Sequence, residues 1–101
     1  MPMQSVYESH FTREMGCTAD ELRAWLPGAS RQATIRCLDT GAHLEWPGGS
    51  LRMHWQALPP RRVALICLPR LSVTFDFGSV TEDERSRFMR HFDLYTQRGG
   101  G

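Results

Sequence analysis

The spacing of apolar residues changes along this chain, and this change limits the fold more than any other feature. Between residues 33 and 77 apolar and polar residues alternate over several short stretches, whereas on either side apolar residues recur three and four positions apart. Alternation is typical of strands with one buried face, and three-to-four spacing is typical of amphipathic helices. The sequence therefore predicts one sheet with a helix before it and a helix after it.

The alternating region divides into five predicted strands at short connections that contain glycine or proline. Short connections favour strands that pair antiparallel in sequence order. The predicted strands are 33–39, 42–46, 50–57, 63–68 and 71–77. A sixth strand is predicted at 5–11 from Tyr7 and Phe11, although their spacing of four also fits a helical turn.

Each predicted helix begins with a capping box, in which a threonine and a glutamate three residues later bond to each other's backbone amides. Thr81 and Glu84 start the longer helix, which we expect over 82–97 with one apolar stripe. Thr18 and Glu21 start a shorter helix of two turns, and Pro27-Gly28 is expected to end it.

Together these elements predict an α+β fold. We expect an antiparallel meander sheet of five to six strands, with the short helix and the longer C-terminal helix packed on its apolar face. This layout is similar in topology to TBP-like and helix-grip folds, some of which hold a ligand between helix and sheet. A single domain is expected over 1–98, followed by a flexible glycine tail at 99–101.

The tail resembles the Gly-Gly terminus of ubiquitin-like and sulfur-carrier proteins. In those proteins a strand leads into the tail, whereas here a patterned helix does. We therefore interpret Gly99 as the stop of the helix and the remaining glycines as a frayed end.

Composition excludes several classes of function. All 12 basic residues are arginine, as is typical of G+C-rich bacterial coding sequences, and without lysine the chain has no Schiff base, lysine general base or P-loop lysine. A net charge of +1 argues against nucleic-acid binding. With three cysteines, no CxxC pair, no signal peptide and no apolar run of ~20 residues, we expect a cytoplasmic protein that does not enter the membrane.

No residue set indicates a catalytic centre, a metal or a cofactor. His43, Glu45, His54 and Asp76 lie at polar positions of neighbouring strands, but no spacing rule brings them together, so we interpret them as solvated cross-strand pairs. Cys17 precedes a helix, where a thiol can become a nucleophile, yet a buried apolar role is more common for such a cysteine.

Two binding functions remain open. Residues 63–68 are apolar at every position, so this strand is either central and covered on both faces or part of an interface. Our first interpretation is a non-catalytic binding or protein-interaction module that forms a homodimer or binds a protein partner, with Ala64, Ile66 and Leu68 at the interface.

The alternative is a small-molecule binding domain with a pocket between helix and sheet. Its predicted walls are Trp25, Trp46 and Trp55, and Arg52 or Arg62 would meet an anionic or amphipathic ligand. If side chains fill that space, the same tryptophans are core residues. The other two cysteines, Cys37 and Cys67, are expected to pack inward on their strands.

Overall fold

Both predicted helices form and begin at the predicted threonines. The computed structural model describes residues 6–31 and 33–97, so residue 5 of the strand predicted at 5–11 and the glycine tail lie outside the described residues. Helix α1 (Ala19–Ala29) begins at Thr18, whose hydroxyl oxygen accepts from the Glu21 amide at 3.1 Å and whose amide donates to the Glu21 carboxylate at 2.9 Å. Helix α2 (Glu82–Gln97) has the predicted bounds.

The predicted end of α1 at Pro27-Gly28 is wrong. Pro27 lies inside the helix, and both the amide and the hydroxyl of Ser30 donate to the Leu26 carbonyl oxygen, at 2.9 and 2.6 Å, which closes the last turn. These two bonds let the helix continue past the proline to Ala29.

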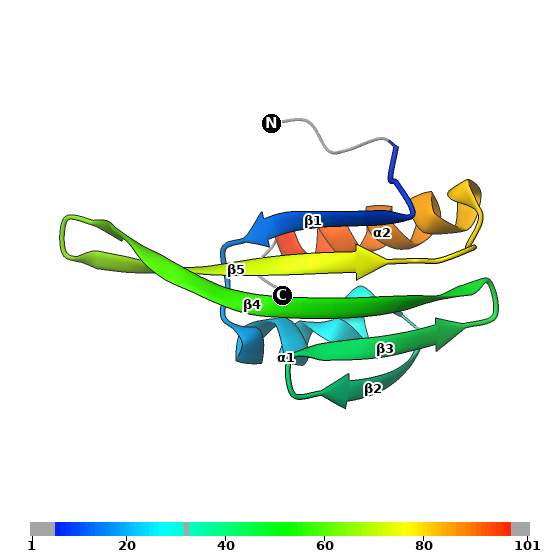
Figure 1. Ribbon diagram of the computed structural model, residues 1–101, viewed down its shortest axis with the longest axis horizontal. Helices are drawn as coiled ribbons and strands as arrows, with labels where there is room; N and C mark the ends of the chain where they lie inside the picture. Colours follow the sequence, from blue (N-terminus) through cyan, green and yellow to red (C-terminus); the bar gives the residue numbers. More distant parts are fainter. Residues whose placement is uncertain (1–5, 32, 98–101) are drawn as a thin grey trace.

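Five strands form one antiparallel sheet, and the predicted α+β class is confirmed (Figure 1). The strand order is β1-β5-β4-β3-β2, so the last four strands form a meander and the first strand joins β5. The strands are β1 (His10–Met15), β2 (Thr34–Leu38), β3 (Gly41–Trp46), β4 (Gly49–Val63) and β5 (Ile66–Asp76).

The predicted separate strand at 63–68 is wrong, because this segment is the tip of a hairpin made by two long strands. β4 and β5 run through the proline segments that we had interpreted as connections, and the chain turns at Ala64 and Leu65. The prolines are tolerated because the pairing is irregular between Leu58 and Arg61, and because β4 and β5 have no further neighbours there that need an N–H donor.

The predicted first strand also begins too early. β1 starts at His10, and Tyr7 lies before it, yet Tyr7 is fully buried. Its ring centroid is 6.2 Å from that of Phe11, and its hydroxyl donates to Asp93 of α2 at 2.6 Å. Tyr7 is therefore buried because it anchors α2, and not because it belongs to a strand.

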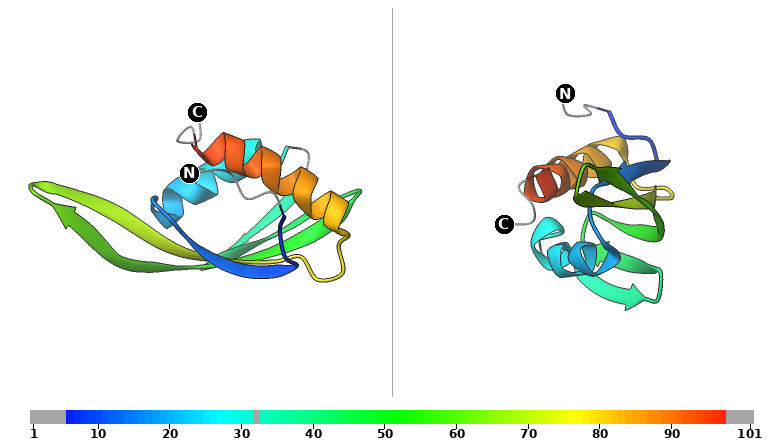
Figure 2. Two further views of the ribbon diagram at one scale, coloured as in Figure 1. Left: turned by 90° about the horizontal axis from the view of Figure 1, so that it is seen from above. Right: turned by 90° about the vertical axis from the view of Figure 1, so that its left-hand side faces the viewer.

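Both helices cover one face of the sheet, and the core lies between this face and the helices (Figure 2, left). Of the alternating residues that we expected inside, Leu51, Val73 and Phe75 are buried at 0% exposure and Trp55 at 2%, whereas Cys37 and Ala57 are exposed. α1 and α2 approach closely, since a Cβ atom at Gly28 would overlap the Tyr95 ring. Neither described helix is long and apolar enough to cross a membrane.

The hairpin of β4 and β5 extends well past the rest of the sheet. β3 pairs with β4 only as far as His54, and β1 pairs with β5 only as far as Leu71. We call residues 58–70 the arm. Figure 1 shows the arm as a two-stranded ribbon that projects from one end of the molecule.

Candidate functional site

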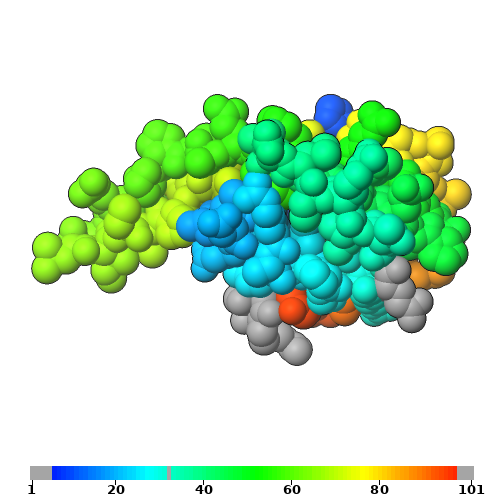
Figure 3. Space-filling view, turned by 90° about the horizontal axis from the view of Figure 1, so that it is seen from below, coloured from blue at the N-terminus to red at the C-terminus, as the bar shows by residue number. Residues whose placement is uncertain are grey.

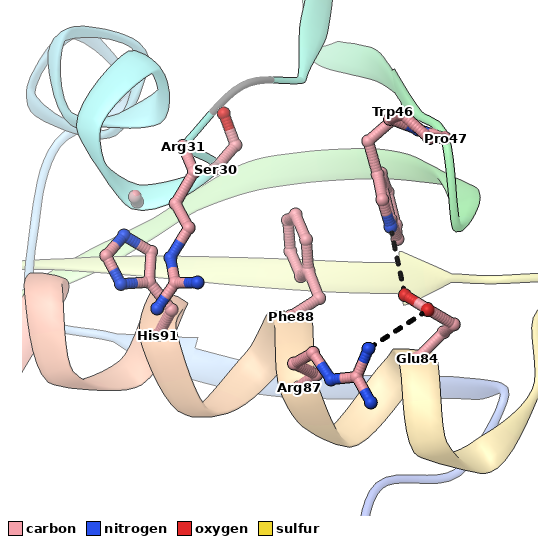
Figure 4. Close-up of a pocket in the computed structure, with 9 residues that line it drawn as sticks. Ser30, Arg31, Trp46, Pro47, Glu84, Arg87, Phe88 and His91 are labelled. Carbon is pink, nitrogen blue, oxygen red and sulfur yellow. Dashed lines mark hydrogen bonds and ion pairs between the residues drawn. The ribbon is translucent and has the colours of Figure 1, made fainter.

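A pocket of about 250 Å³ opens between the end of α1, the turn from β3 to β4, and α2 (Figure 4). This volume is slightly below the ~300–1,000 Å³ of typical ligand sites, so the pocket suits a small molecule. Its lining residues are Ala29, Ser30, Arg31, Trp46, Pro47, Glu84, Arg87, Phe88 and His91.

Trp46 and Phe88 form a flat apolar wall of the pocket. Their ring centroids are 4.7 Å apart and their planes differ by 19°, so the two rings are stacked. The indole Nε1 of Trp46 also donates to Oε2 of Glu84 at 3.4 Å. The stacking and this bond hold the indole in one orientation from two sides.

The Glu84 carboxylate bonds to Trp46 and Arg87, and it does not complete the predicted capping box. The amide of Glu84 donates to the Thr81 hydroxyl oxygen at 3.3 Å, as expected, but its carboxylate accepts from Trp46 and from Nη1 of Arg87, the latter at 3.3 Å. A Cβ atom at Gly48 would overlap this carboxylate. The glycine therefore lets the turn from β3 to β4 approach α2.

His91 lies at the other end of the pocket, half-buried against α1. Its Nε2 is 2.8 Å from the carbonyl oxygen of Gly28. Because a carbonyl oxygen only accepts hydrogen bonds, Nε2 carries the hydrogen, and Nδ1 does not take part in this bond. The contact of His91 with the end of α1 is a finding of the structure.

Arg31 is the first residue after the cap of α1, and its backbone is in the left-handed region with φ of 58°. This conformation strains any residue with a Cβ atom. Among residues 6–31 and 33–97 its exposed side chain has no hydrogen-bond or ion-pair partner. Figure 4 shows Arg31 and His91 at one end of the pocket, with Phe88 between them and Glu84.

The structure does not bring the five predicted ligand residues together. Trp46 lines the pocket just described, whereas Trp55 is buried in the core, with the Arg23 guanidinium 5.5 Å from its ring centroid. Trp25 borders a separate hollow of about 170 Å³ near Cys17 and Asp93.

Neither of the two predicted arginines lines a pocket with these tryptophans. Arg52 is exposed and lies one residue from the buried Met53, so it is on the sheet face opposite the helices. Arg62 lies on the arm, where it pairs with Cys67.

The outer face of the sheet carries one row of polar residues across all five strands. His43 lies opposite Arg52, and Arg52 lies opposite Asp76, with Arg36 and His10 at the two ends of the row. Glu45 and His54, which the sequence analysis considered together with His43 and Asp76, lie in neighbouring rows. The described residues contain no group of three or more histidine, cysteine, aspartate or glutamate side chains placed to hold a metal ion.

The three cysteines are free, and two of them lie where the sequence did not place them. Cys37 and Cys67 are exposed, so their predicted inward packing is wrong: Cys37 is near the end of edge strand β2, and Cys67 is on the arm, beyond the helices. Cys17 is buried, and this burial raises the pKa of its thiol to about 11. A thiol that stays protonated at neutral pH does not support nucleophilic catalysis.

We expect iodoacetamide at about pH 8 to label Cys37 and Cys67 and to leave Cys17 unmodified in the folded protein. With a pKa of about 11, Cys17 has on the order of 0.1% thiolate at that pH, and its sulfur is shielded. Mass spectrometry of tryptic peptides measures the three rates. Labelling of Cys17 as fast as that of Cys37 would contradict the prediction.

The arm exposes apolar side chains at its tip. Leu65 is 103% exposed and Ile66 is 60% exposed, and Val63 and Leu68 are also exposed. Figure 3 shows the arm standing clear of the body, with only its base in contact with other parts of the described chain. The predicted interface residues Ala64, Ile66 and Leu68 all lie on this arm.

No protein-family model matches this chain, and no curated protein matches it either. Function must therefore be inferred from the pocket and the arm. The sequence did not predict that four polar residues line one pocket: Arg31, Glu84, Arg87 and His91. The available signal was the spacing of the last three, which places them along one side of α2 beside Phe88.

Proposed function

We propose that this protein is a non-catalytic interaction module that self-associates through the arm. The observation that supports this proposal is the exposure of Val63, Leu65, Ile66 and Leu68 at the end of a ribbon that no other described element covers. An isolated two-stranded hairpin is marginally stable in water, so packing against a partner stabilises it. Contiguous exposed apolar side chains are typical of interaction sites.

Three of these side chains form one continuous patch. Val63 lies opposite Ile66, and Arg61 lies opposite Leu68. Directly opposed residues share a face of a sheet, and alternate residues of a strand do so as well, so Val63, Ile66 and Leu68 are neighbours on one face. A flat patch of this kind can pack against an identical patch on a second copy.

An acidic residue at the base of the arm offsets part of its positive charge. Arg70 donates to Oε1 of Glu14 at 2.8 Å, and this bond lowers the pKa of Glu14, which therefore stays ionised. Arg61 also interacts with the Glu14 charge. Glu14 therefore offsets one of the three arginine charges of residues 58–70, and the charges of Arg61 and Arg62 oppose the approach of two copies, so self-association is expected to strengthen as salt is added.

Pairing through the strand edges is less favourable than pairing through the faces. Pro59, Pro60 and Pro69 have no amide hydrogen to donate to an added strand. A two-fold dimer formed by the apolar faces needs no such donor, and each copy supplies the same patch. We therefore assign the face of the arm that carries Ile66 as the contact surface.

The patch is small, so the dimer is expected to be weak. Burial of one large aliphatic side chain contributes about 1.5–3 kcal/mol, and part of the total from a few such residues is offset by the loss of translational and rotational freedom. We therefore expect an equilibrium between monomer and dimer that depends on concentration in the micromolar range.

Sedimentation velocity on the wild type and on Ile66→Glu tests the proposal. The wild type should shift from monomer to dimer between about 10 and 500 µM, and Ile66→Glu should raise the dissociation constant at least about tenfold because it buries a charge in the patch. Leu94→Glu is the matched control, since Leu94 is an exposed leucine on α2, away from the arm, and it should leave the equilibrium unchanged.

The proposal fails if the wild type is monomeric over this whole range. It also fails if Leu94→Glu weakens the dimer as much as Ile66→Glu does. Circular dichroism spectra of both variants establish that each one is folded before the comparison.

A further inference from the structure

We infer that the pocket beside α2 binds a small carboxylic acid with a flat, aromatic body. This inference goes beyond self-association and does not depend on the arm, because no residue of 58–70 lines the pocket. It rests on the arrangement of one flat apolar wall and one unpaired cationic group at opposite ends of a pocket of about 250 Å³.

The flat body of the ligand would lie against the Trp46–Phe88 wall. The two stacked rings are fixed by their contact and by the Trp46–Glu84 bond, so the wall needs no rearrangement to receive a ring. Aromatic rings prefer offset stacking or edge contacts with other rings, and the half-buried indole of Trp46 offers its exposed part for such a contact, whereas Phe88 is buried beneath it. The wall thus selects a planar apolar group over a branched one.

The carboxylate would lie at the Arg31 end. Arg87 already donates to Glu84, whereas the Arg31 side chain has no partner within residues 6–31 and 33–97. The guanidinium group matches a carboxylate through two parallel hydrogen bonds. Holding this arginine in the left-handed backbone region is unfavourable for folding, and strained residues of this kind cluster at binding sites.

The electrostatics of the pocket favour one negative charge over two. The C-terminal end of α1 meets the pocket, and its Gly28 carbonyl oxygen is the group bonded by His91. The C-terminal end of a helix carries partial negative charge, and Glu84 adds a full one. The first turn of α2 lines the pocket through Glu84, but the Glu84 amide already donates to the Thr81 hydroxyl oxygen and its carboxylate repels a phosphate group, which carries nearly two negative charges. A monoanionic carboxylate is the better match.

Titration of ¹⁵N-labelled protein with naphthalene-2-carboxylate and with benzoate tests the inference. We expect a saturable shift of the Trp46 indole N–H signal, assigned with Trp46→Phe, with a midpoint of about 1 mM or below for the naphthalene acid. The neutral naphthalene-2-carboxamide should bind at least about tenfold more weakly, because it lacks the charge that Arg31 pairs with. Phenyl phosphate should also bind more weakly than benzoate.

Two variants at one position separate a binding role from a structural one. Arg31→Gln and Arg31→Gly should each weaken binding of naphthalene-2-carboxylate at least about tenfold. Because glycine adopts the backbone conformation of Arg31 without strain, Arg31→Gly should lose binding while its melting temperature stays equal to or above that of the wild type. Arg36→Gln, an exposed arginine on β2, is the matched control and should bind normally.

The inference is overturned if neither carboxylate shifts the Trp46 signal at up to about 10 mM. It is also overturned if the carboxamide or phenyl phosphate binds at least as tightly as the matching carboxylate, or if the Arg31 variants bind like the wild type. Ile66→Glu should bind the ligand normally, so failure of the proposed dimer and failure of the pocket can be told apart.

Discussion

Replacing Asp93 with alanine is expected to lower the free energy of unfolding by about 3 kcal/mol. Asp93 is 4% exposed on α2 and accepts two short hydrogen bonds, one from the Tyr7 hydroxyl and one from Nη2 of Arg13, each at 2.6 Å. Removal of the carboxylate leaves a buried phenol and a largely buried guanidinium group without their acceptor. The desolvation of these groups is then no longer compensated.

The effect is large because Asp93 joins three parts of the chain. Tyr7 precedes β1, Arg13 lies on β1, and Asp93 lies on α2, so the carboxylate fixes the edge strand to the helix layer. Two effects raise the pKa of Tyr7 far above its usual value: burial of the phenol is the larger, and the hydrogen bond to Asp93 is the next. Tyr7 therefore remains a hydrogen-bond donor throughout the neutral range, and the contribution it makes is lost only in strongly alkaline solution as the pH rises through its folded-state pKa.

Urea denaturation of Asp93→Ala and two controls measures this contribution. Tyr7→Phe removes one of the two bonds and should lower the free energy of unfolding by about 1–2 kcal/mol. Asp20→Ala removes an aspartate whose pair with Arg23 is exposed, and it should lower the value by less than about 1 kcal/mol. The prediction is contradicted if Asp93→Ala is no less stable than Asp20→Ala.

The period of the apolar pattern predicted the fold class because one face of the sheet is buried under helices and the other is not. Leu51, Trp55 and Val73 alternate with polar residues for this reason, and all three are buried. The pattern failed at 63–68, where every residue is apolar. A ribbon with two exposed faces and a strand with two buried faces both lack alternation, so periodicity alone does not distinguish the arm from a central strand.

The candidate pocket depends on features that sequence patterns carry only in part. The spacing of Glu84, Arg87 and His91 shows that they share one side of α2, but which element faces that side is decided by how α2 packs on α1 and on the turn at Trp46. The left-handed backbone of Arg31 has no signal in the sequence, since glycine or asparagine is the usual residue after a helix cap.

Replacing Phe75 with alanine is expected to have the largest effect on stability, a loss of about 4 kcal/mol in the free energy of unfolding. Phe75 is fully buried on β5, the strand between β1 and β4. Its ring stacks on Phe11 of β1 with centroids 4.9 Å apart, and it meets Phe92 of α2 edge-on at 5.4 Å. The Arg13 guanidinium lies 5.1 Å from the ring centroid, so the ring also helps to position the arginine that binds Asp93.

Alanine at this position leaves a cavity beside Phe11, Arg13 and Phe92. Because these groups come from two different layers, β1 of the sheet and helix α2, no single shift of the backbone can fill the cavity. Phe75→Leu retains most of the volume and should lose about 1–2 kcal/mol, while Leu38→Ala, at an exposed position on β2, should change the value by less than about 0.5 kcal/mol. Urea or thermal unfolding gives all three values. A loss for Phe75→Ala that is no greater than that for Phe75→Leu would mean that the ring is not packed between the sheet and α2, and the arrangement of the two layers would then be wrong at its centre.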